Sequence, residues 1–282
     1  MIKVSSENGL ASIIIPCWNA AGFTQRCLES VWRWTSHPYE LIAVDNGSYD
    51  ATGRILASFF NRFKKNSKEK ASRGPQRFLR LRNAKNLGFA KAINQGMQRA
   101  AGGYMVWLNN DTVVTPHWLE RLISGAETNR DIGAVGPRIY RLAGAQAVAQ
   151  VNYRNLDEMP LFSEAWALRN SGRVTEVPLL LGCCLLLKRS VIARIGMVEE
   201  GFGLGNYEDF DLCLRALQAG YRLVIAEDVF LHHDYHATFQ ANSLDFNKEI
   251  AISRQKFRDK WRKLRVPANS ERVDDALASM GI

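Results

Sequence analysis

Long apolar runs are missing from this sequence of 282 residues. A membrane-spanning helix needs about 18 or more consecutive apolar residues. The most apolar segment, VPLLLGCCLLL from Val177, ends at Lys188 and Arg189. The first residues also lack the charged stretch, long apolar stretch and small-residue cleavage site of a secretory signal. We therefore expect a cytoplasmic protein without a transmembrane segment.

Paired cysteine spacing is absent as well. The sequence contains no CxxC motif, and each cysteine lies in an apolar or helix-patterned stretch. The five are Cys17, Cys27, Cys183, Cys184 and Cys213. Isolated, apolar surroundings are typical of reduced core cysteines, so we expect neither a disulfide framework nor a structural zinc site.

Acidic residues are scarce in two segments of a chain whose formal charge is +9. Between Arg62 and Arg82, nine basic residues face a single acid, and NKEIAISRQKFRDKWRKLRV near the C-terminus interleaves Phe257 and Trp261 with basic residues. Solvated surfaces explain both segments, and attraction to an anionic membrane or nucleic acid is the alternative. No recognition-helix motif is visible. We therefore expect no nucleic-acid partner, and peripheral membrane contact through the C-terminal basic helix as a hypothesis.

Strand-length apolar runs alternate with segments of helical period, which is the pattern of an α/β sheet with crossover helices. The predicted strands are SIIIP, ELIAVD, RFLRLR, YMVWL, IGAVGPRIY, LLLGCCLLL and YRLVIA. Helices are predicted between them, with Thr115 and Pro116 beginning HWLERLISGA. From about Leu142 to Leu179 the periodicity fades, and we expect loops or short strands that form a substrate-facing flap. A final basic helix is expected from about Ala241 to Leu264.

Carboxylates stand at the ends of two predicted strands and at the start of one predicted helix. Asp45 closes ELIAVD, Asp111 follows YMVWL, and Glu208 and Asp209 open the helix after GFGLGN. Because parallel strands keep their ligand crevice at their carboxyl ends, these groups are expected to converge there. The structural alternatives are an Asx turn at Asp45 and, for the helix acids, a dipole interaction worth about 0.3 to 1 kcal/mol.

Two adjacent histidines follow another apolar stretch of strand character. If that strand ends at the same crevice, it presents either His232 or His233 there. One imidazole, Asp111 and the two phosphates of a nucleotide would complete a divalent metal site.

Six sequence blocks, in this order, resemble the family 2 glycosyltransferases of the GT-A fold. They are ASIIIPCWN, LIAVDNGSYDAT, RNAKNLGFAKAINQG, WLNNDT, LGCCLLLKRSVI and GFGLGNYEDFDLCLRALQAGYRL, with FLHH beyond. The resemblance covers about Ser12 to His233 and is nearest to the bacterial branch often labelled rhamnosyltransferase-like. It implies a GT-A fold with a Rossmann-like, mostly parallel central sheet and helices on both faces. The C-terminal helical extension, which lies outside the resemblance, is predicted from the basic helical segment alone.

The resemblance also implies a domain division. Residues 1–240 would form the glycosyltransferase domain, with a nucleotide-binding half at about 1–136 and an acceptor-binding half at about 137–240. Residues 241–282 would form the C-terminal basic helix and tail.

The same resemblance implies a nucleotide-sugar site. Trp18 matches the aromatic residue that stacks on the base, and Asp45 matches the acid that accepts a hydrogen bond from it. Asn109 to Asp111 occupy the DxD motif, with an amide in place of the first acid. The implied binding residues are Pro16, Trp18, Asn19, Asp45, Asn86, Gly88, Asn94, Asn109, Asn110, Asp111 and Glu208.

Metal-assisted, inverting chemistry is implied for this site. Asp111 and His232 match metal ligands for Mn²⁺ or Mg²⁺, with His233 as the alternative histidine. Asp209 matches the catalytic base, which an acceptor hydroxyl requires because it is a poor nucleophile before its proton is removed. The implied donor is a UDP or dTDP sugar. The implied acceptor is a glycan, lipid-linked or other hydroxyl compound in polysaccharide or glycoconjugate biosynthesis.

Two other functions were weighed against this one. A nucleotidyltransferase that makes sugar nucleotides normally carries a glycine-rich, arginine-containing phosphate loop after its first strand, and PCWNAAGF from Pro16 has none. A non-catalytic basic module that binds membranes or nucleic acid would show binding that falls steeply with salt. The sequence has no recognition-helix motif and no stacked aromatic sheet pattern, so we interpret the basic segments as an accessory feature.

Overall fold

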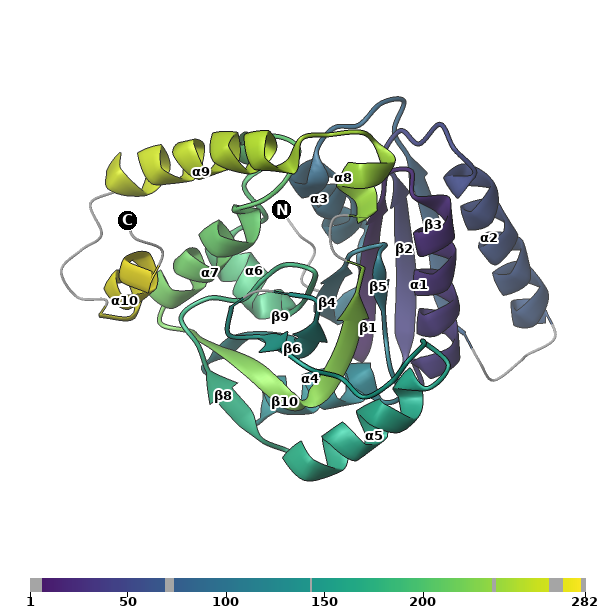
Figure 1. Cartoon of the computed structure of the whole chain (residues 1–282), viewed down its shortest axis with the longest axis horizontal. Coiled ribbons are helices and arrows are strands. Elements are labelled where there is room, and N and C mark those ends of the chain that lie inside the picture. The colour runs from purple at the N-terminus through teal and green to yellow at the C-terminus, as the bar shows by residue number, and fades with distance from the viewer. Residues whose placement is uncertain (1–6, 69–73, 143, 235–236, 264–270, 280–282) are drawn as a thin grey trace.

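The computed structural model describes residues 7–68, 74–142, 144–234, 237–263 and 271–279. Its centre is a twisted sheet with the strand order β3-β2-β1-β4-β9-β6-β10-β5, with β7 beside β6 and β8 beside β10 (Figure 1). The strands are β1 (Glu7–Cys17), β2 (Tyr39–Asp45), β3 (Arg77–Arg82), β4 (Gly102–Leu108), β5 (Thr112–Val113), β6 (Ile132–Tyr140), β7 (Ala147–Val148), β8 (Val174–Glu176), β9 (Cys184–Lys188) and β10 (Arg222–His233).

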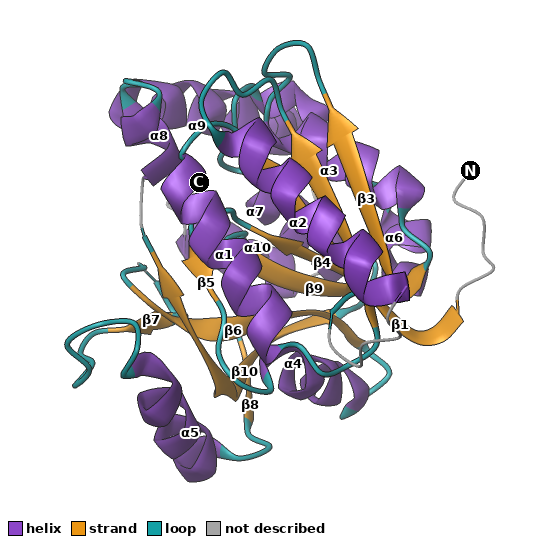
Figure 2. Ribbon diagram, turned by 90° about the vertical axis from the view of Figure 1, so that its right-hand side faces the viewer, coloured by secondary structure: helices purple, strands orange, loops and turns teal. Residues whose placement is uncertain are grey.

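Helices cover both faces of this sheet (Figure 2). They are α1 (Ala21–Trp34), α2 (Thr52–Lys68), α3 (Phe89–Arg99), α4 (Trp118–Glu127), α5 (Met159–Asn170), α6 (Arg189–Ile195), α7 (Glu208–Gln218), α8 (Ala237–Ala241), α9 (Phe246–Lys263) and α10 (Glu271–Ser279), with a 3-10 turn η1 (Glu200–Phe202). One core cluster joins the sheet to α1, α2 and α4, and a second joins it to α3, α6, α7 and α9.

The N-terminal strands form the parallel part of the sheet. β1 pairs in parallel with β2 and β4, and β2 pairs in parallel with β3. Ile13 and Ile15 enter one core cluster while Ile14 enters the other, and all three are fully buried. An uninterrupted β-branched run suits a strand covered on both faces. The predicted central strand is therefore confirmed.

β9 connects the parallel strands to the remainder of the sheet. It pairs antiparallel with β4 on one side and with β6 on the other. β6 spans the expected boundary at residues 136/137, so the two expected halves share one continuous sheet.

A helix occupies part of the segment in which loops or short strands were expected. Within α5, Phe162 and Trp166 pack against Phe230 of β10, while Leu161 and Leu168 are 75% and 82% exposed. Because its apolar residues do not form a single stripe, α5 has no clear helical pattern in the sequence. The Trp166 indole N–H donates to the Glu227 carbonyl at 2.7 Å. The short strands β7 and β8 in this segment agree with the prediction, whereas the helix α5 between them was not predicted.

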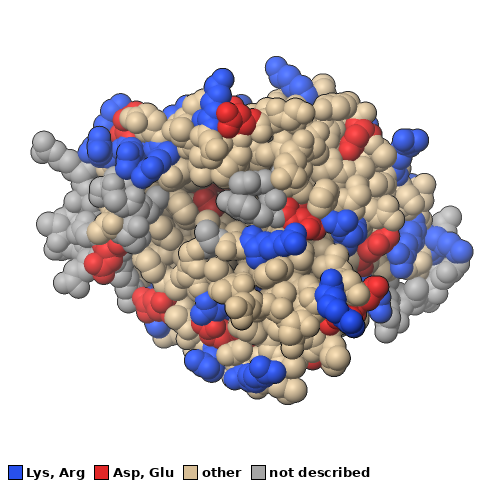
Figure 3. Space-filling view, in the orientation of Figure 1, with Lys and Arg blue, Asp and Glu red and all other residues tan. Residues whose placement is uncertain are grey.

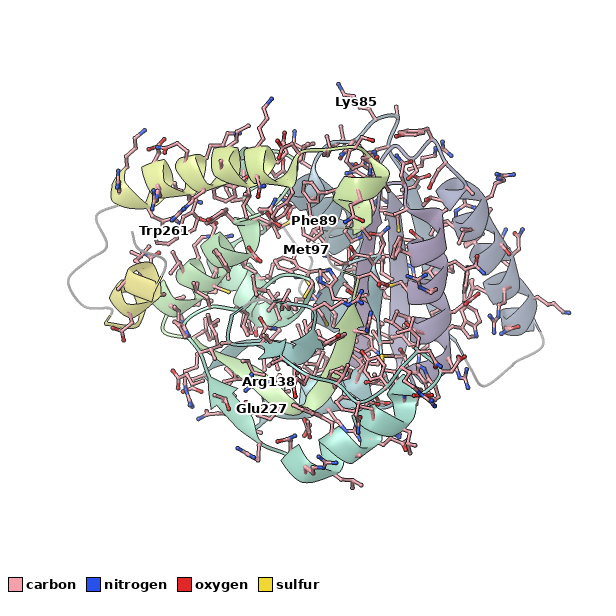
Figure 4. All side chains as sticks on the ribbon, in the orientation of Figure 1. Lys85, Phe89, Met97, Arg138, Glu227 and Trp261 are labelled. Carbon is pink, nitrogen blue, oxygen red and sulfur yellow. The ribbon has the colours of Figure 1, made fainter. Side chains whose placement is uncertain are left out.

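An ion pair holds β6 to β10 beneath α5. The Arg138 guanidinium donates from Nε and Nη2 to the two carboxylate oxygens of Glu227, each at 2.7 Å (Figure 4). Such a forked geometry fixes both side chains. The ion pair therefore fixes β6 and β10 to each other ahead of the end of β10 at His233.

The predicted start of α4 is two residues too early. The helix begins at Trp118 after His117, whose φ is 60°. The Thr115 hydroxyl donates to the Phe230 carbonyl at 2.7 Å, and it makes no cap hydrogen bond to the helix. Attachment to β10 therefore replaces the N-cap role expected for Thr115.

The C-terminal basic helix exists, but its aromatic residues point inward. Phe257 and Trp261 are 0% and 2% exposed, and Trp261 lies on the side of α9 that faces α7 (Figure 4). Both rings therefore belong to the interior of the protein, and membrane contact through the basic residues of this helix stays a prediction. On the face shown in Figure 3, basic side chains are scattered among acidic ones over several elements. Across the described ranges, no helix is both long and apolar enough to span a bilayer.

Candidate functional site

A cavity of about 270 Å³ lies at the carboxyl ends of β1, β2 and β4. Its polar lining includes Asn109, Asp111, Glu208 and Asp209. Of the residues expected at a nucleotide-sugar site, those that line this cavity are Pro16, Trp18, Asn86, Asn109, Asn110, Asp111, Glu208 and Asp209. The predicted convergence of strand-end groups therefore applies to Asp111 and to the acids of α7.

Strand pairing brings Asp111 next to a histidine. β5 follows Asp111 and pairs antiparallel with the end of β10. This places the His233 Nε2 3.1 Å from the Asp111 Oδ1, and both side chains are buried. His233 also lines the cavity.

His232 faces the other side of the same strand, as successive strand residues must. Its Nδ1 lies 2.6 Å from the Tyr153 hydroxyl, and its Nε2 lies 3.5 Å from the Asp234 Oδ1. It does not line the cavity. The histidine beside Asp111 is therefore His233, which the sequence analysis gave as the alternative. The expected pair of Asp111 and His232 does not form.

Asp111 and His233 could supply two of the ligands of a divalent cation, which is fewer than such an ion needs. Carboxylate oxygen and imidazole nitrogen are both ligands of Mn²⁺, whereas Mg²⁺ favours oxygen. The Asn109 Oδ1 is buried, lines the same cavity and has no hydrogen-bond partner among the described residues. No cluster of three or more His, Cys, Asp or Glu side chains suited to a metal occurs in the described part of the chain. A cation here would therefore need oxygens from a ligand as well.

Two buried carboxylates open α7 on the cavity wall. The Asp209 Oδ2 accepts the Gly182 N–H at 2.7 Å, and its Oδ1 accepts the Phe210 N–H at 2.9 Å. Burial raises the pKa of Asp209, and these backbone donors oppose the rise. Burial also raises the pKa of Glu208, and the charge of Asp209 raises it further. Asp209 is therefore the member of the pair that ionises first and in a fixed orientation.

A glycine makes the contact with Asp209 possible. A Cβ added at Gly182 would lie 2.9 Å from the Asp209 Cβ, closer than such atoms approach in folded proteins. Only glycine lets the backbone N–H reach the carboxylate at this point.

An amide cluster also lines the cavity, through Asn46 and Asn86. The Asn46 Nδ2 donates to the Asn86 Oδ1 at 2.7 Å and to the Gly88 carbonyl at 3.2 Å. Its Oδ1 accepts the Asn83 Nδ2 and the Leu87 N–H at 2.9 and 3.1 Å. Asn46 thus fixes the orientation of Asn86, and Trp18 lines the same cavity. Sequence reasoning missed Asn46 because it assigned the NGS segment to a turn.

The side chains of Asp45 and Asn19 accept hydrogen bonds from neighbouring backbone segments. The Asp45 Oδ1 accepts the Ser48 N–H at 2.9 Å, which is the Asx-type turn considered as an alternative, and its Oδ2 lies 3.6 Å from Arg82. The Asn19 Oδ1 accepts the Tyr49 N–H at 2.9 Å. Neither side chain lines the cavity.

Asn94 and Gly88 are also outside the cavity lining. The Asn94 Nδ2 donates to the Val198 carbonyl and the Glu200 carboxylate, both at 2.8 Å, which ties α3 to η1. Asn110 does line the cavity, although its Nδ2 donates to the Thr24 hydroxyl at 2.8 Å. The side-chain amides of Asn94 and Asn110 therefore hold together the segments around the cavity.

The C-terminal segment supplies an apolar wall that sequence reasoning did not find. Phe239 of α8, Leu244 of the segment between α8 and α9, and Phe246 and Ile250 of α9 line the cavity. They follow the last matching block, FLHH, and the expected domain division at 240/241 separated most of them from the site. The recurrence of apolar residues after His233 is the sequence feature that could have indicated this wall. Phe89 adds an aromatic ring from α3, packed edge-on against Trp107.

Comparison with protein families finds one match. The model described as glycosyl transferase family 2 matches residues 12–196, more than half of the chain. Glycosyltransferase AglE of Haloferax volcanii is 26% identical over 232 residues, which cover 82% of this chain and 68% of AglE. The uncharacterized protein y4gI of Sinorhizobium fredii is 26% identical over 245 residues. That alignment covers 81% of this chain but only 25% of y4gI, so the chain spans a quarter of that relative's length.

Solved structures share the fold at lower identity. GalNAc-T7, solved with UDP, GalNAc and Mn²⁺, has a TM-score of 0.60 and 17% identity over 79% of this chain and 43% of its own. The mannosyltransferase PcManGT from Pyrobaculum calidifontis, solved with GDP-Man and Mn²⁺, has a TM-score of 0.55 and 18% identity over 96% and 74%. S. aureus TarS 1–349 has a TM-score of 0.59 and 15% identity over 95% and 69%. The predicted fold class, with its C-terminal helices, is confirmed.

Proposed function

Because the chain belongs to glycosyl transferase family 2, we propose that it moves a sugar from a nucleoside diphosphate sugar to an acceptor hydroxyl with inversion at the anomeric carbon. The observation that carries the proposal is the composition of one cavity. Asp209 lines it as an oriented, buried carboxylate, and Asp111 and His233 line it as a buried pair. Trp18 and Asn86 line the same cavity and are the groups proposed to bind the nucleotide.

Asp209 is the proposed catalytic base. Its carboxylate accepts the proton of the acceptor hydroxyl as the oxygen attacks the anomeric carbon from the face opposite the leaving diphosphate. The hydrogen bonds from Gly182 and Phe210 hold both of its oxygens in place. Glu208 stays protonated to a higher pH because of its burial and its charged neighbour, so it can donate a hydrogen bond to a sugar oxygen.

Asp111 and His233 are the proposed holders of a divalent ion, Mn²⁺ or Mg²⁺, together with the donor phosphates. When bound, the ion supplies positive charge that stabilises the departing diphosphate. Asn109 adds a neutral oxygen beside the phosphates, where a second carboxylate would repel them. His233 replaces His232 in this proposal because only His233 lies beside Asp111.

The donor is proposed to be a UDP or dTDP sugar. Trp18 offers a half-buried ring for stacking, and Asn86 is held with its Oδ1 engaged, so that its Nδ2 is the group left to donate. A pyrimidine carbonyl can accept such a bond. The expected contact from Asp45 is not part of this proposal, because that carboxylate serves the Ser48 turn. Membership of the rhamnosyltransferase-like branch, a lipid-linked or glycan acceptor and peripheral membrane contact remain predictions.

A thermal-shift panel tests the proposal. UDP, dTDP and GDP sugars are added with and without Mn²⁺, and donor binding is expected to raise the melting temperature by mass action. The shift should be largest for the UDP or dTDP series and should fall without metal. An Asp111→Asn variant serves as the control that loses the metal-dependent part. No shift with any sugar nucleotide would contradict the proposed function, and a shift with GDP sugars alone would contradict the donor class.

A further inference from the structure

The proposed base stands on a helix that is held by a segment outside the matched family region. α9 begins at Phe246, fifty residues beyond residue 196, where the family match ends. It lies across α7 and beside η1 (Figure 1). Its buried residues, Ser253, Phe257 and Trp261, recur at every fourth position. This spacing places all three on one face of the helix.

Asp211 of α7 makes the hydrogen bond and the ion pair that attach α9 to α7. Its side chain is fully buried, two residues beyond Asp209. Its Oδ1 accepts the Trp261 indole N–H at 3.1 Å and lies 2.7 Å from the Lys260 Nζ. Its Oδ2 accepts the Arg215 Nε at 2.8 Å. This buried carboxylate is costly to disrupt, because removing either cation leaves its charge less compensated and removing the indole takes away a hydrogen-bond donor.

Lys260 also reaches the segment that leads into α7. Its Nζ lies 2.9 Å from the Glu199 Oε2 as well as 2.7 Å from the Asp211 Oδ1. Glu199 precedes η1 and Asp211 follows the base. One ammonium group therefore joins both ends of the glycine-rich stretch between them.

The glycine-rich stretch itself needs such support. Gly203, Asn206 and Tyr207 have φ values of 99°, 73° and 72°, a region unfavourable for the two residues that carry a Cβ. The Ser253 hydroxyl lies within hydrogen-bond distance of the Phe202 and Gly205 carbonyls, at 2.9 and 2.8 Å. The Phe257 ring packs 5.3 Å from the Tyr207 ring. Backbone strain of about 1–3 kcal/mol per residue persists only where surrounding contacts hold it.

We propose that α9 is a positioning element of the transferase, in which Ser253, Lys260 and Trp261 hold the start of α7 so that Asp209 meets the acceptor hydroxyl. The inference rests on the proposed role of Asp209. It assigns the basic C-terminal helix to the catalytic geometry. A small displacement of a catalytic group can cost about 10²-fold in rate, so contacts that never touch substrate can still set turnover.

Single substitutions in the intact chain test this assignment. Lys260→Met removes the ammonium but keeps the stem, and Trp261→Phe removes the indole donor but keeps a ring. Lys260→Arg restores the charge. Lys263→Met is the matched control, since Lys263 is exposed on the same helix. The readouts are hydrogen–deuterium exchange of residues 201–211, and kcat and KM for consumption of the sugar nucleotide that gives the largest thermal shift.

Faster exchange in 201–211 and a kcat lowered about 10- to 100-fold are expected for Lys260→Met and Trp261→Phe, with donor KM unchanged. Lys260→Arg should recover most of the turnover, and Lys263→Met should match the wild type. Wild-type exchange and kcat in both variants would overturn the inference, as would a lowered melting temperature with unchanged kcat. If the wild-type chain consumes no sugar nucleotide, the proposed function fails, and wild-type exchange in the variants would still overturn the inference.

Discussion

Two walls of the same cavity are built on different principles. The wall that we propose to be catalytic, called the catalytic wall below, consists of Asn109, Asp111, Glu208 and Asp209. The C-terminal wall consists of Phe239, Leu244, Phe246 and Ile250. The catalytic wall presents buried polar groups, of which Asp111 and Asp209 have partners at fixed distances. The C-terminal wall presents apolar side chains that pack on one another, with the Phe239 and Phe246 rings 5.1 Å apart at 89°.

The difference shows where directional and non-directional forces are used. Hydrogen bonds fix the angle of a carboxylate, which proton transfer requires. Apolar contact has no preferred direction, but it excludes water and so strengthens the electrostatic interactions inside the cavity. We therefore expect the catalytic wall to control turnover and the C-terminal wall to control binding.

The largest expected effect is that of Asp209→Asn. The amide keeps the size of the side chain but cannot accept the acceptor proton, so kcat should fall about 10²- to 10⁴-fold. Sugar-nucleotide affinity should stay close to that of the wild type, as measured by calorimetry. Turnover retained within a few-fold would remove Asp209 from the role of base.

The next effect concerns the two histidines. His233→Gln should weaken Mn²⁺-dependent nucleotide binding by at least about tenfold, because the imidazole beside Asp111 is lost. His232→Gln is the matched control and should keep the metal dependence, since His232 contacts Tyr153 and Asp234. Titration with Mn²⁺ at fixed nucleotide measures both. The reverse result would restore the original sequence-based assignment.

Catalysis should also be lost on acidification, at a pH above the ordinary aspartate range. Burial raises the pKa of Asp209, and the base must be ionised to act. Below that raised pKa, kcat/KM should fall about tenfold per pH unit. A pH profile of the wild-type chain measures the inflection. An inflection within the ordinary aspartate range would mean that burial does not govern this carboxyl.

A moderate effect is expected on the C-terminal wall. Phe246→Ala should weaken substrate binding about three- to tenfold, because removing a partly buried ring loses on the order of 1 kcal/mol of apolar contact. Turnover at saturating substrate should change little. Ile252→Ala is the control, since Ile252 is an exposed apolar residue on the same helix. A loss of kcat as large as that of Asp209→Asn would erase the distinction between the walls.

The smallest effect is a pH-dependent gain in stability from Glu208→Gln. Burial, reinforced by the charge of Asp209, raises the pKa of Glu208, so the folded chain holds this proton more tightly than the unfolded chain. Stability from the protonated group is complete below the ordinary glutamate pKa and is lost as the pH rises through the raised value. The variant should therefore gain a few degrees in melting temperature at about pH 9 and almost nothing at about pH 4. Equal shifts at both values would contradict this sign.

Sequence reasoning located most of the catalytic wall because its residues follow local patterns. Asp111 ends an apolar run that is long enough for a buried strand, and Asp209 follows a glycine-rich segment at a helix start. Both positions can be derived from hydrophobic period and turn residues alone. Asp45 looked equivalent in the sequence, yet its carboxylate turns back to the Ser48 N–H. Local pattern placed the residue but could not decide where the carboxylate points.

The sequence by itself determined the order of the seven predicted strands, and with it the edge of the sheet at which the cavity forms. Tertiary structure decided which histidine meets Asp111, because that choice depends on the one-residue register between β5 and β10. Tertiary structure also decided that α5 is a helix, that Phe246 lines the cavity and that Trp261 is buried. Those outcomes depend on packing between segments distant in sequence, such as Trp261 against Asp211. Periodicity within a single segment contains no information about such partners.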